Sequence, residues 1–223
     1  MTTTPARTAR KAFTLADALR EFWKHPSPWM IGVTLVAALT ARVIVGDYRI
    51  TDGLVVLILI GIFPFVEWII HVVVLHWRPR RIGGVTVDTL LARKHREHHV
   101  DPRDVPLIFI PWQTLLGAVP TFVAVALLVF PRTGLGLTFL AGVGVIGLGY
   151  EWCHYLIHSD YKPKTRMYKA IWRHHRLHHF KNEHYWFTVV CANTADHVLR
   201  TAPDPATVPT SPTAKSLHAG RDA

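Results

Sequence analysis

The sequence has only two cysteines among its 223 residues, Cys153 and Cys191, and neither belongs to a CxxC pair. This scarcity argues against a disulfide framework and against a zinc site built from thiolates. Each cysteine is instead expected to be a small buried side chain. The sequence also lacks a recognisable DNA- or RNA-binding motif. It shows no cleavable signal peptide, because its basic N-terminus precedes a polar stretch and then an apolar run without a cleavage-like end.

Hydrophobic residues, by contrast, are abundant and occur in long runs. They make up 50% of the chain, and the mean hydropathy is +0.21, which is high for a water-soluble protein. The formal net charge of +10 comes from lysines and arginines that lie beside the apolar runs. A basic chain binds either nucleic acid or an anionic membrane surface. The placement of these charges favours the membrane.

Four apolar segments each approach the roughly 20 residues that a helix needs to cross a bilayer. The sequence therefore predicts an all-α integral membrane protein with four transmembrane helices, at residues 29–46, 53–75, 107–130 and 135–158. A basic loop at residues 77–106, rich in arginine and histidine, joins the two pairs of spans. The last span contains several glycines. They indicate either close helix packing or a channel for a lipid chain.

Three regions outside the spans contain most of the lysine and arginine: an N-terminal arm (1–28), the loop 77–106 and the segment after residue 158. Because positive loops stay in the cytoplasm and the number of spans is even, we expect both termini and the histidine-rich regions on the cytoplasmic side. The expected location is the plasma (inner) membrane of a bacterium.

The predicted domain organisation has three parts. The N-terminal arm 1–28 is either a short amphipathic helix on the membrane surface or a solvated lead-in. Residues 29–200 form one membrane-embedded domain. Residues 201–223 are rich in Pro, Thr, Ser and Ala, and this composition predicts a disordered tail.

Histidine is the most unusual feature, because fifteen are present and most fall in four clusters. Neutral imidazole binds first-row transition metals well, and residues three or four apart on a helix share a face. The first cluster differs, since its histidines are five apart, about 140° around an ideal helix. They can reach two metals, or one if the helix loosens at its end. The clusters are His71-Val-Val-Val-Leu-His76, His95-Arg-Glu-His98-His99, His154-Tyr-Leu-Ile-His158 and His174-His175-Arg-Leu-His178-His179.

The order of the clusters predicts that they meet. Two adjoin the ends of predicted spans at one membrane face, and two lie in the segments that follow, an order that unrelated surface histidines would not show. Even without His174, which precedes the last motif, ten imidazoles are too many for one ion, so the sequence predicts a dinuclear metal site in a cytoplasmic histidine-rich helical cap. Metal-bound histidines usually donate their second N–H to a carboxylate or carbonyl. Glu67, Glu97 and Glu151 adjoin or lie within clusters and are candidates for that role.

The set HxxxxH, HxxHH, HxxxH, HxxHH resembles that of the fatty acid hydroxylase superfamily, which includes sphingolipid fatty-acid hydroxylases, sterol C5-desaturases, sterol C4-methyl oxidases and carotenoid hydroxylases. The resemblance covers about residues 60–200. Local sequence adds to the resemblance, because three stretches look like the fatty-acid hydroxylase branch. They are Glu67-Trp-Ile-Ile-His71, Tyr150-Glu151-Trp152-Cys153-His154 and His178-His179-Phe180-Lys181-Asn182.

The resemblance implies no catalytic residue beyond the metal centre. It implies ten metal ligands: His71, His76, His95, His98, His99, His154, His158, His175, His178 and His179. Asp196 resembles an acidic position after the last histidine box, and we expect it either to support a ligand or to cap a helix. His174 and His184 are weaker ligand candidates. His25, His197 and His218 are not expected to be ligands.

The implied activity is O2-dependent hydroxylation of a lipid C–H bond in a fatty acyl or sphingolipid-like substrate drawn from the bilayer. The implied cofactors are two iron ions, with zinc possible in the purified protein, together with O2. No cytochrome b5-like domain is fused to the chain, so a separate ferredoxin- or cytochrome b5-like protein is the expected electron donor.

Two other hypotheses stay open at this point. One is a sterol or carotenoid hydroxylase or desaturase of the same superfamily. The other is a non-enzymatic membrane protein that binds or transports metal. The histidines gather at one membrane face, which argues against transport, because a translocation path needs ligands near mid-bilayer.

Overall fold

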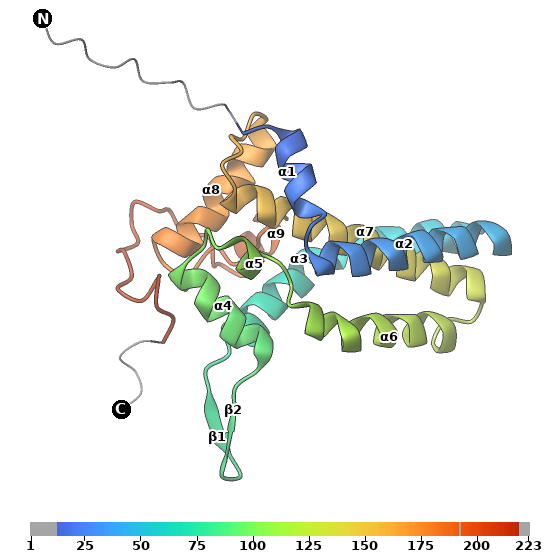
Figure 1. Ribbon diagram of the computed structural model, residues 1–223, viewed down its shortest axis with the longest axis horizontal. Coiled ribbons are helices and arrows are strands. Elements are labelled where there is room, and N and C mark those ends of the chain that lie inside the picture. Colours follow the sequence, from blue (N-terminus) through green and yellow to red (C-terminus); the bar gives the residue numbers. More distant parts are fainter. Residues whose placement is uncertain (1–12, 192, 219–223) are drawn as a thin grey trace, which may run out of the picture.

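A computed structural model describes residues 13–191 and 193–218. In this part of the chain, four helical segments are long and apolar enough to cross a membrane, and they run side by side in Figure 1. They agree with the four predicted spans to within a few residues at each end. The segments are α2 (Pro26–Val45), α3 (Ile50–Ile69) with its π-helical continuation η1 (Ile70–Leu75), α5 (Val105–Ile108) with α6 (Trp112–Leu128), and α7 (Thr133–His158).

Helix α7 is the centre of the bundle and packs against α2, α3 and α6. Its glycines explain how closely the helices approach. A Cβ atom at Gly136 would clash with the carbonyl oxygen of Ala126 on α6, and one at Gly144 would lie 3.0 Å from the Leu35 Cβ on α2. A Cβ at Gly149 would meet nothing within 4 Å. Close packing, the first of the two predicted explanations, therefore applies at Gly136 and Gly144.

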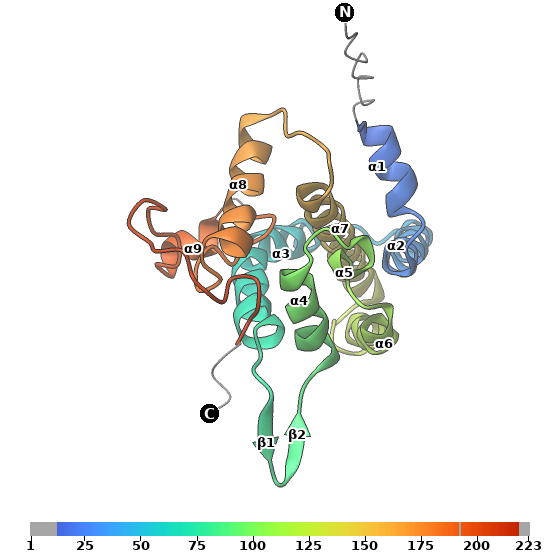
Figure 2. The ribbon, with the colours of Figure 1, turned by 60° about the vertical axis from the view of Figure 1, so that its left-hand side comes forward.

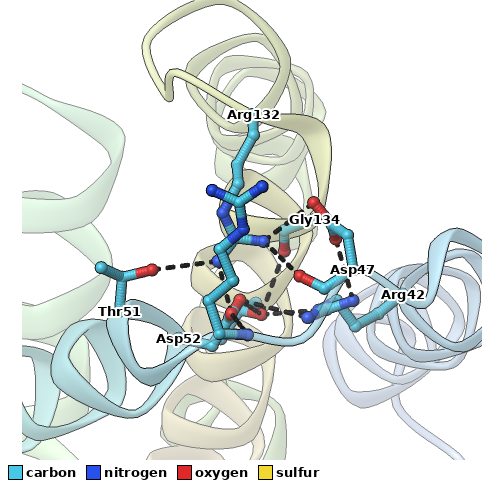
Figure 3. Close-up of polar contacts among 8 residues, drawn as sticks. Arg42, Asp47, Thr51, Asp52, Arg132 and Gly134 are labelled. Atoms are coloured by element: carbon cyan, nitrogen blue, oxygen red, sulfur yellow. Dashed lines mark hydrogen bonds and ion pairs between the residues drawn. The ribbon is translucent and has the colours of Figure 1, made fainter.

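A clasp of ion pairs joins the two short turns at one end of the bundle (Figure 3). Arg42 on α2 contacts Asp47 at 3.4 Å and Asp52 at 3.2 Å, and Arg132 contacts the same two carboxylates. The hydroxyl of Thr138 donates to Asp52 at 2.8 Å. Two guanidinium groups thus balance two carboxylates, which offsets the cost of burying Arg42 and Asp52 between apolar helices.

The remaining helices gather at the opposite end of the bundle: α1 (Leu15–Phe22), α4 (Leu90–Val100), α8 (Arg166–Phe180) and α9 (Thr194–Val198) (Figures 1 and 2). The predicted helix of the N-terminal arm is α1. It begins at a capping box and buries Ala18 and Phe22, whereas Leu15 and Leu19 are 47% and 49% exposed. This exposed apolar pair suits a helix at a membrane surface. Residues 1–12 of the arm lie outside the described residues.

The chain is not wholly α-helical, so the predicted fold class needs one correction. The segment predicted as a basic loop contains an antiparallel hairpin of β1 (Arg80–Ile82) and β2 (Val85–Val87), followed by α4. Gly83 and Gly84, with φ of 56° and 84°, form the turn. Two-residue hairpin turns of this kind require positive φ at both positions, which glycine adopts without strain. The hairpin projects away from the helices in Figure 2.

The predicted disorder of residues 201–223 is wrong for residues 201–218. This segment has no regular helix or strand, but Val208, Ala214 and Leu217 are buried. The hydroxyl of Ser211 donates to a Glu183 carboxylate oxygen at 3.0 Å, and the hydroxyl of Thr213 donates to the same oxygen. The composition of this segment is typical of disorder. Composition does not show, however, that Ser211 and Thr213 bind the buried Glu183 carboxylate. Residues 219–223 lie outside the described part.

We predict that Gly136→Ala destabilises the bundle, since the new methyl group must push the backbone of α6 away from α7. Overpacking of this kind costs about 1–3 kcal/mol, to be measured as a fall in the thermal unfolding midpoint of the purified protein in detergent. Gly149→Ala in the same helix is the matched control and should leave the midpoint unchanged or raise it, because alanine favours helix. Equal effects of the two substitutions would contradict close packing at Gly136.

Candidate metal centre

Ten histidines form two adjacent groups at the end of the bundle where the short helices gather. Within each group, one nitrogen atom from every imidazole lies within 4.8 Å of those of the other four. Nine of the ten side chains are buried, and His76 is half-buried. The structure therefore brings together all the histidines of the predicted ligand set. Group A comprises His71, His76, His95, His99 and His178, and group B comprises His98, His154, His158, His175 and His179.

The repeated HxxHH motif explains how α4 and α8 each supply both groups. His95 and His99 are four residues apart, share a face of α4 and enter group A, whereas His98 enters group B from the neighbouring face. Helix α8 has the reverse arrangement, since His175 and His179 enter group B and His178 enters group A. The two helices thus lie against the same pair of sites and hold them together.

A local change of helix type aligns the first cluster. At the end of α3 the chain becomes π-helical, and the N–H of His76 donates to the carbonyl of His71 at 3.0 Å. This wider turn, closed by a bond between residues five apart, brings the two imidazoles to 5.0 Å between ring centroids. Of the two arrangements that the sequence allowed, the structure has the one in which the helix loosens and both histidines join one group.

The donor sets fit metal ions of the first transition row. Metal–imidazole bonds of about 2.0–2.1 Å place the nitrogens around one ion roughly 3–4 Å apart. In group A, Nε2 of His71 lies 3.1 Å from Nε2 of His178, and in group B the two Nε2 atoms of His158 and His175 are 3.0 Å apart. Both ring nitrogens of His98 are buried and have no hydrogen-bond partner among the described residues. Metal coordination would satisfy one of them, and the burial of such a nitrogen is otherwise costly. Imidazole suits iron and zinc alike.

Burial also keeps these imidazoles in the form that binds metal. It lowers the pKa of His99 to about 4, and it lowers the pKa of His95, His98, His175 and His179 well below the ordinary value. The rings are therefore neutral near pH 7. A neutral imidazole coordinates a metal without first releasing a proton.

Backbone carbonyls fix the orientation of two rings. His99 Nδ1 lies 2.8 Å from the carbonyl oxygen of Ala214, and His178 Nδ1 lies 2.8 Å from that of Tyr185. When Nδ1–H donates to the carbonyl, Nε2 is left free for a metal. Sequence reasoning missed both acceptors, since a backbone carbonyl is present at every residue and leaves no motif.

The three glutamates expected to contact ligand histidines have other partners. Glu67 accepts hydrogen bonds from the backbone N–H groups of Val189 and Val190, both at 3.0 Å, and Glu151 accepts one from the N–H of Ile110 at 3.0 Å. Both carboxylates thus secure segments that lie beside the centre. Glu97 is at the surface, with its side chain 44% exposed, and pairs with Lys94. Among the described contacts, none joins these carboxylates to an imidazole.

Asp196 is fully buried and connects α8 to the segment after it. It accepts a hydrogen bond from Nε2 of His174 at 3.0 Å and from the N–H groups of Phe187 and Thr188 at 2.9 and 2.8 Å. Burial raises the pKa of this carboxyl, but the hydrogen bonds from His174 and Thr188 outweigh burial and lower it to about 2. Asp196 therefore supports the residue next to His175 and fixes the segment that covers group A.

The other histidines lie outside both groups. The His184 side chain is 52% exposed beside Glu183, and the His25 ring stacks on Phe109 at 4.2 Å between centroids. His218 approaches the carbonyl of His76 through its Nε2, at 3.1 Å. His174 bonds Asp196 and does not belong to either set.

Comparison with known proteins identifies this arrangement of histidines. A family model described as fatty acid hydroxylase matches residues 56–201, a range that contains all ten histidines of the two groups. The chain belongs to the fatty acid hydroxylase family. A dihydroceramide fatty acyl 2-hydroxylase of Arabidopsis thaliana, a similar protein, is 28% identical over 131 residues, which are 57% of this chain and 53% of that relative. The match thus spans about half the length of the relative. No solved structure matches the chain significantly.

We predict two bound metal ions per chain, measured by elemental analysis of the purified protein against its amino-acid content. His179→Ala removes a nitrogen from group B, and the ratio should fall toward one because group A keeps its five donors. His184→Ala is the matched control and should keep two ions, since this exposed histidine is in neither group. A ratio that falls equally in the two variants would contradict the assignment.

We also predict that metal is retained under mildly acidic conditions. Protons compete with metal only where they bind the free imidazole, and burial has lowered the pKa of His99 from 6.5 to about 4. Metal content, measured after dialysis against a chelator at stepped pH, should therefore persist at pH 5.5 and fall as the pH approaches 4. Loss centred near pH 6.5 would mean that the imidazoles are open to water.

Proposed function

We propose that this protein is a membrane oxygenase that hydroxylates a C–H bond of a fatty acyl or sphingolipid-like lipid at two iron ions held by the ten histidines. The observation on which the proposal rests is the pair of adjacent five-imidazole groups, buried at the end of the apolar bundle. Membership of the fatty acid hydroxylase family and similarity to a dihydroceramide fatty acyl 2-hydroxylase support it.

The reaction consumes one O2, two electrons and two protons for each alcohol and water formed. Two iron ions, once reduced, would supply the activation of O2. The protein's own residues hold neutral imidazoles in fixed positions and exclude water. Phe187 contributes to this exclusion, because its ring contacts those of His71 and His178 at 5.7 and 5.5 Å between centroids.

The proposal includes an orientation and a partner. The histidine-rich end faces the cytoplasm of a bacterium, in accordance with the basic residues that flank the spans at that end. Electrons come from a separate ferredoxin- or cytochrome b5-like protein, which docks on this side. Hydroxylation of the C–H bond of a sterol or carotenoid is the nearest alternative within the same family chemistry.

Mass spectrometry of total lipid extracts from cells that express the protein tests the proposal. A lipid that gains one oxygen with the intact protein and with His184→Ala, but not with His178→Ala, is the expected result. The class of that lipid would identify the substrate. A product that lacks two hydrogens would instead indicate a desaturase.

The contradicting outcome is equally specific. If no lipid changes although two metals are bound, a reductant is supplied and candidate lipids are added to membranes, the oxygenase proposal fails. A metal-handling role would then explain the histidines better.

A further inference from the structure

The segment 161–181, which contains helix α8, has seven lysines and arginines and no aspartate or glutamate. Asp160, just before it, pairs with Arg103 at 3.5 Å. Among the described residues, no carboxylate forms an ion pair with Lys169, Arg173 or Arg176 on the helix itself. The chain thus contains a concentrated positive charge that its own carboxylates do not balance.

The cations of α8 lie on the face opposite to its metal-binding histidines. Lys169 and Arg173 are four residues apart, so they share a face of the helix, and both are exposed. Arg176 continues this face one turn further on. The three histidines that α8 supplies to groups A and B are buried on its other side. A helix with its side chains is about 10–12 Å across, so both groups lie within one helix of the cationic face.

Helix α4 has the same HxxHH motif but not the same surface. Its Lys94 pairs with Glu97 at 2.6 Å, and its Arg96 pairs with Asp88 at 2.6 Å. If the histidines needed cations around them, both helices would carry such charges unpaired. Only α8 does so along a whole face, which indicates a role for these charges outside the chain.

A shallow depression of about 310 Å³ lies on the C-terminal half of the cationic face. The Arg176 guanidinium carbon lies 4.6 Å from the ring centroid of Trp172 and 4.6 Å from that of Phe180. These cation–π contacts hold the guanidinium in place. Aromatic and arginine side chains contribute most of the binding energy at protein interfaces. The depression therefore has the composition of the centre of a protein-docking site, with further cations beside it.

An anionic membrane is the other kind of surface that cations attract. A helix that lies on a membrane buries a continuous apolar face in it. In α8, however, the face opposite to the cations carries the histidines and packs on the protein, and the exposed large apolar residues are only Met167 and Phe180, at opposite ends of the helix. The charge pattern therefore favours a protein partner with an acidic surface.

We propose that this face of α8 docks an acidic, soluble, one-electron carrier protein, with Arg176 at the centre of the contact and Lys169 and Arg173 beside it. The inference rests on the proposed function, because the oxygenase reaction consumes two electrons for each O2. Each reduced carrier gives one electron to the metal centre and leaves oxidised, so two carriers dock in succession in each turnover. Interfaces of electron-transfer proteins are small and depend on complementary charge.

Binding of purified carriers to the iron-loaded full chain in nanodiscs of neutral phosphatidylcholine tests the site. The two probes are a plant-type 2Fe–2S ferredoxin and the soluble domain of a cytochrome b5, both chosen for an acidic surface. At least one should bind, with an association rate that falls steeply as salt is added. Lys169→Glu combined with Arg173→Glu should weaken that binding at least ~10-fold at about 0.15 M salt. Failure of both carriers to bind would overturn the proposal.

Arg81→Glu combined with Arg93→Glu is the matched control. It changes the net charge by the same amount at two exposed residues, on β1 and α4. It should keep the affinity for the carrier within ~3-fold, because charges beyond about 8 Å are largely screened at this salt concentration. Equal loss in the two charge reversals would overturn the proposal in favour of diffuse attraction. Both variants should keep two metals and be reduced fully by excess dithionite, which shows that the centre is intact.

Amine labelling of Lys169, read by peptide mass spectrometry, distinguishes a protein partner from a lipid surface. The bound carrier should protect Lys169 but not Lys24, whose side chain is 64% exposed just after α1. Without the carrier, adding anionic phosphatidylglycerol to the nanodiscs should leave the labelling of Lys169 unchanged. Protection of Lys169 by phosphatidylglycerol would mean that lipid covers this face, and would overturn the proposal.

Failure of this inference can be told apart from failure of the proposed function. If a carrier binds at α8 and reduces the metal centre but no lipid gains oxygen in cells, the oxygenase proposal fails and the docking site stands. If a lipid gains oxygen to the same extent in cells that express Lys169→Glu with Arg173→Glu, the oxygenase proposal stands and the docking site is overturned.

Discussion

Ten imidazoles, nine of them buried, gather at the end of an apolar bundle and are the constraint on which the rest of the structure depends. Each ring has two nitrogens, and a buried nitrogen without a partner costs free energy. Carbonyls satisfy one nitrogen of His99 and of His178, but the His98 ring has no such acceptor among the described residues. A metal bound at each group would offset part of this cost. We therefore expect metal binding and the stability of this end of the protein to be coupled.

Segments far apart in the sequence meet to hold these rings. The π-helical turn brings His76 into the same group as His71. Glu67 accepts hydrogen bonds from the backbone of Val189 and Val190 and so fixes the chain there. Asp196 does the same for the backbone of Phe187, where the segment that covers group A begins. At the far end of the bundle, the clasp of Arg42, Asp47, Asp52 and Arg132 joins both turns. The two membrane helices that carry histidines at one end, α3 and α7, are thus joined by the clasp at the other end.

The sequence predicts the four spans and the meeting of the histidines well, because both depend on long apolar runs and on repeated spacing. It also contained a missed signal, since Gly83-Gly84 between β-branched residues is typical of a tight hairpin. The roles of Ala214 and Tyr185 were not predictable, because backbone carbonyls leave no pattern. Glu97 illustrates the opposite error: its position inside a cluster suggested a contact with a ligand, but it lies on the outer face of α4 beside Lys94.

The central claim is that two metal ions are each surrounded by about five imidazoles. X-ray absorption at the iron edge of the iron-loaded protein tests it most directly, because imidazole rings scatter at distances beyond the first shell and can be counted. The predicted spectrum has a first shell of nitrogen or oxygen at about 2.0–2.1 Å and outer-shell scattering from four to five imidazoles per iron. Sulfur in the first shell, or scattering from fewer than three imidazoles per iron, would contradict the two five-histidine sites.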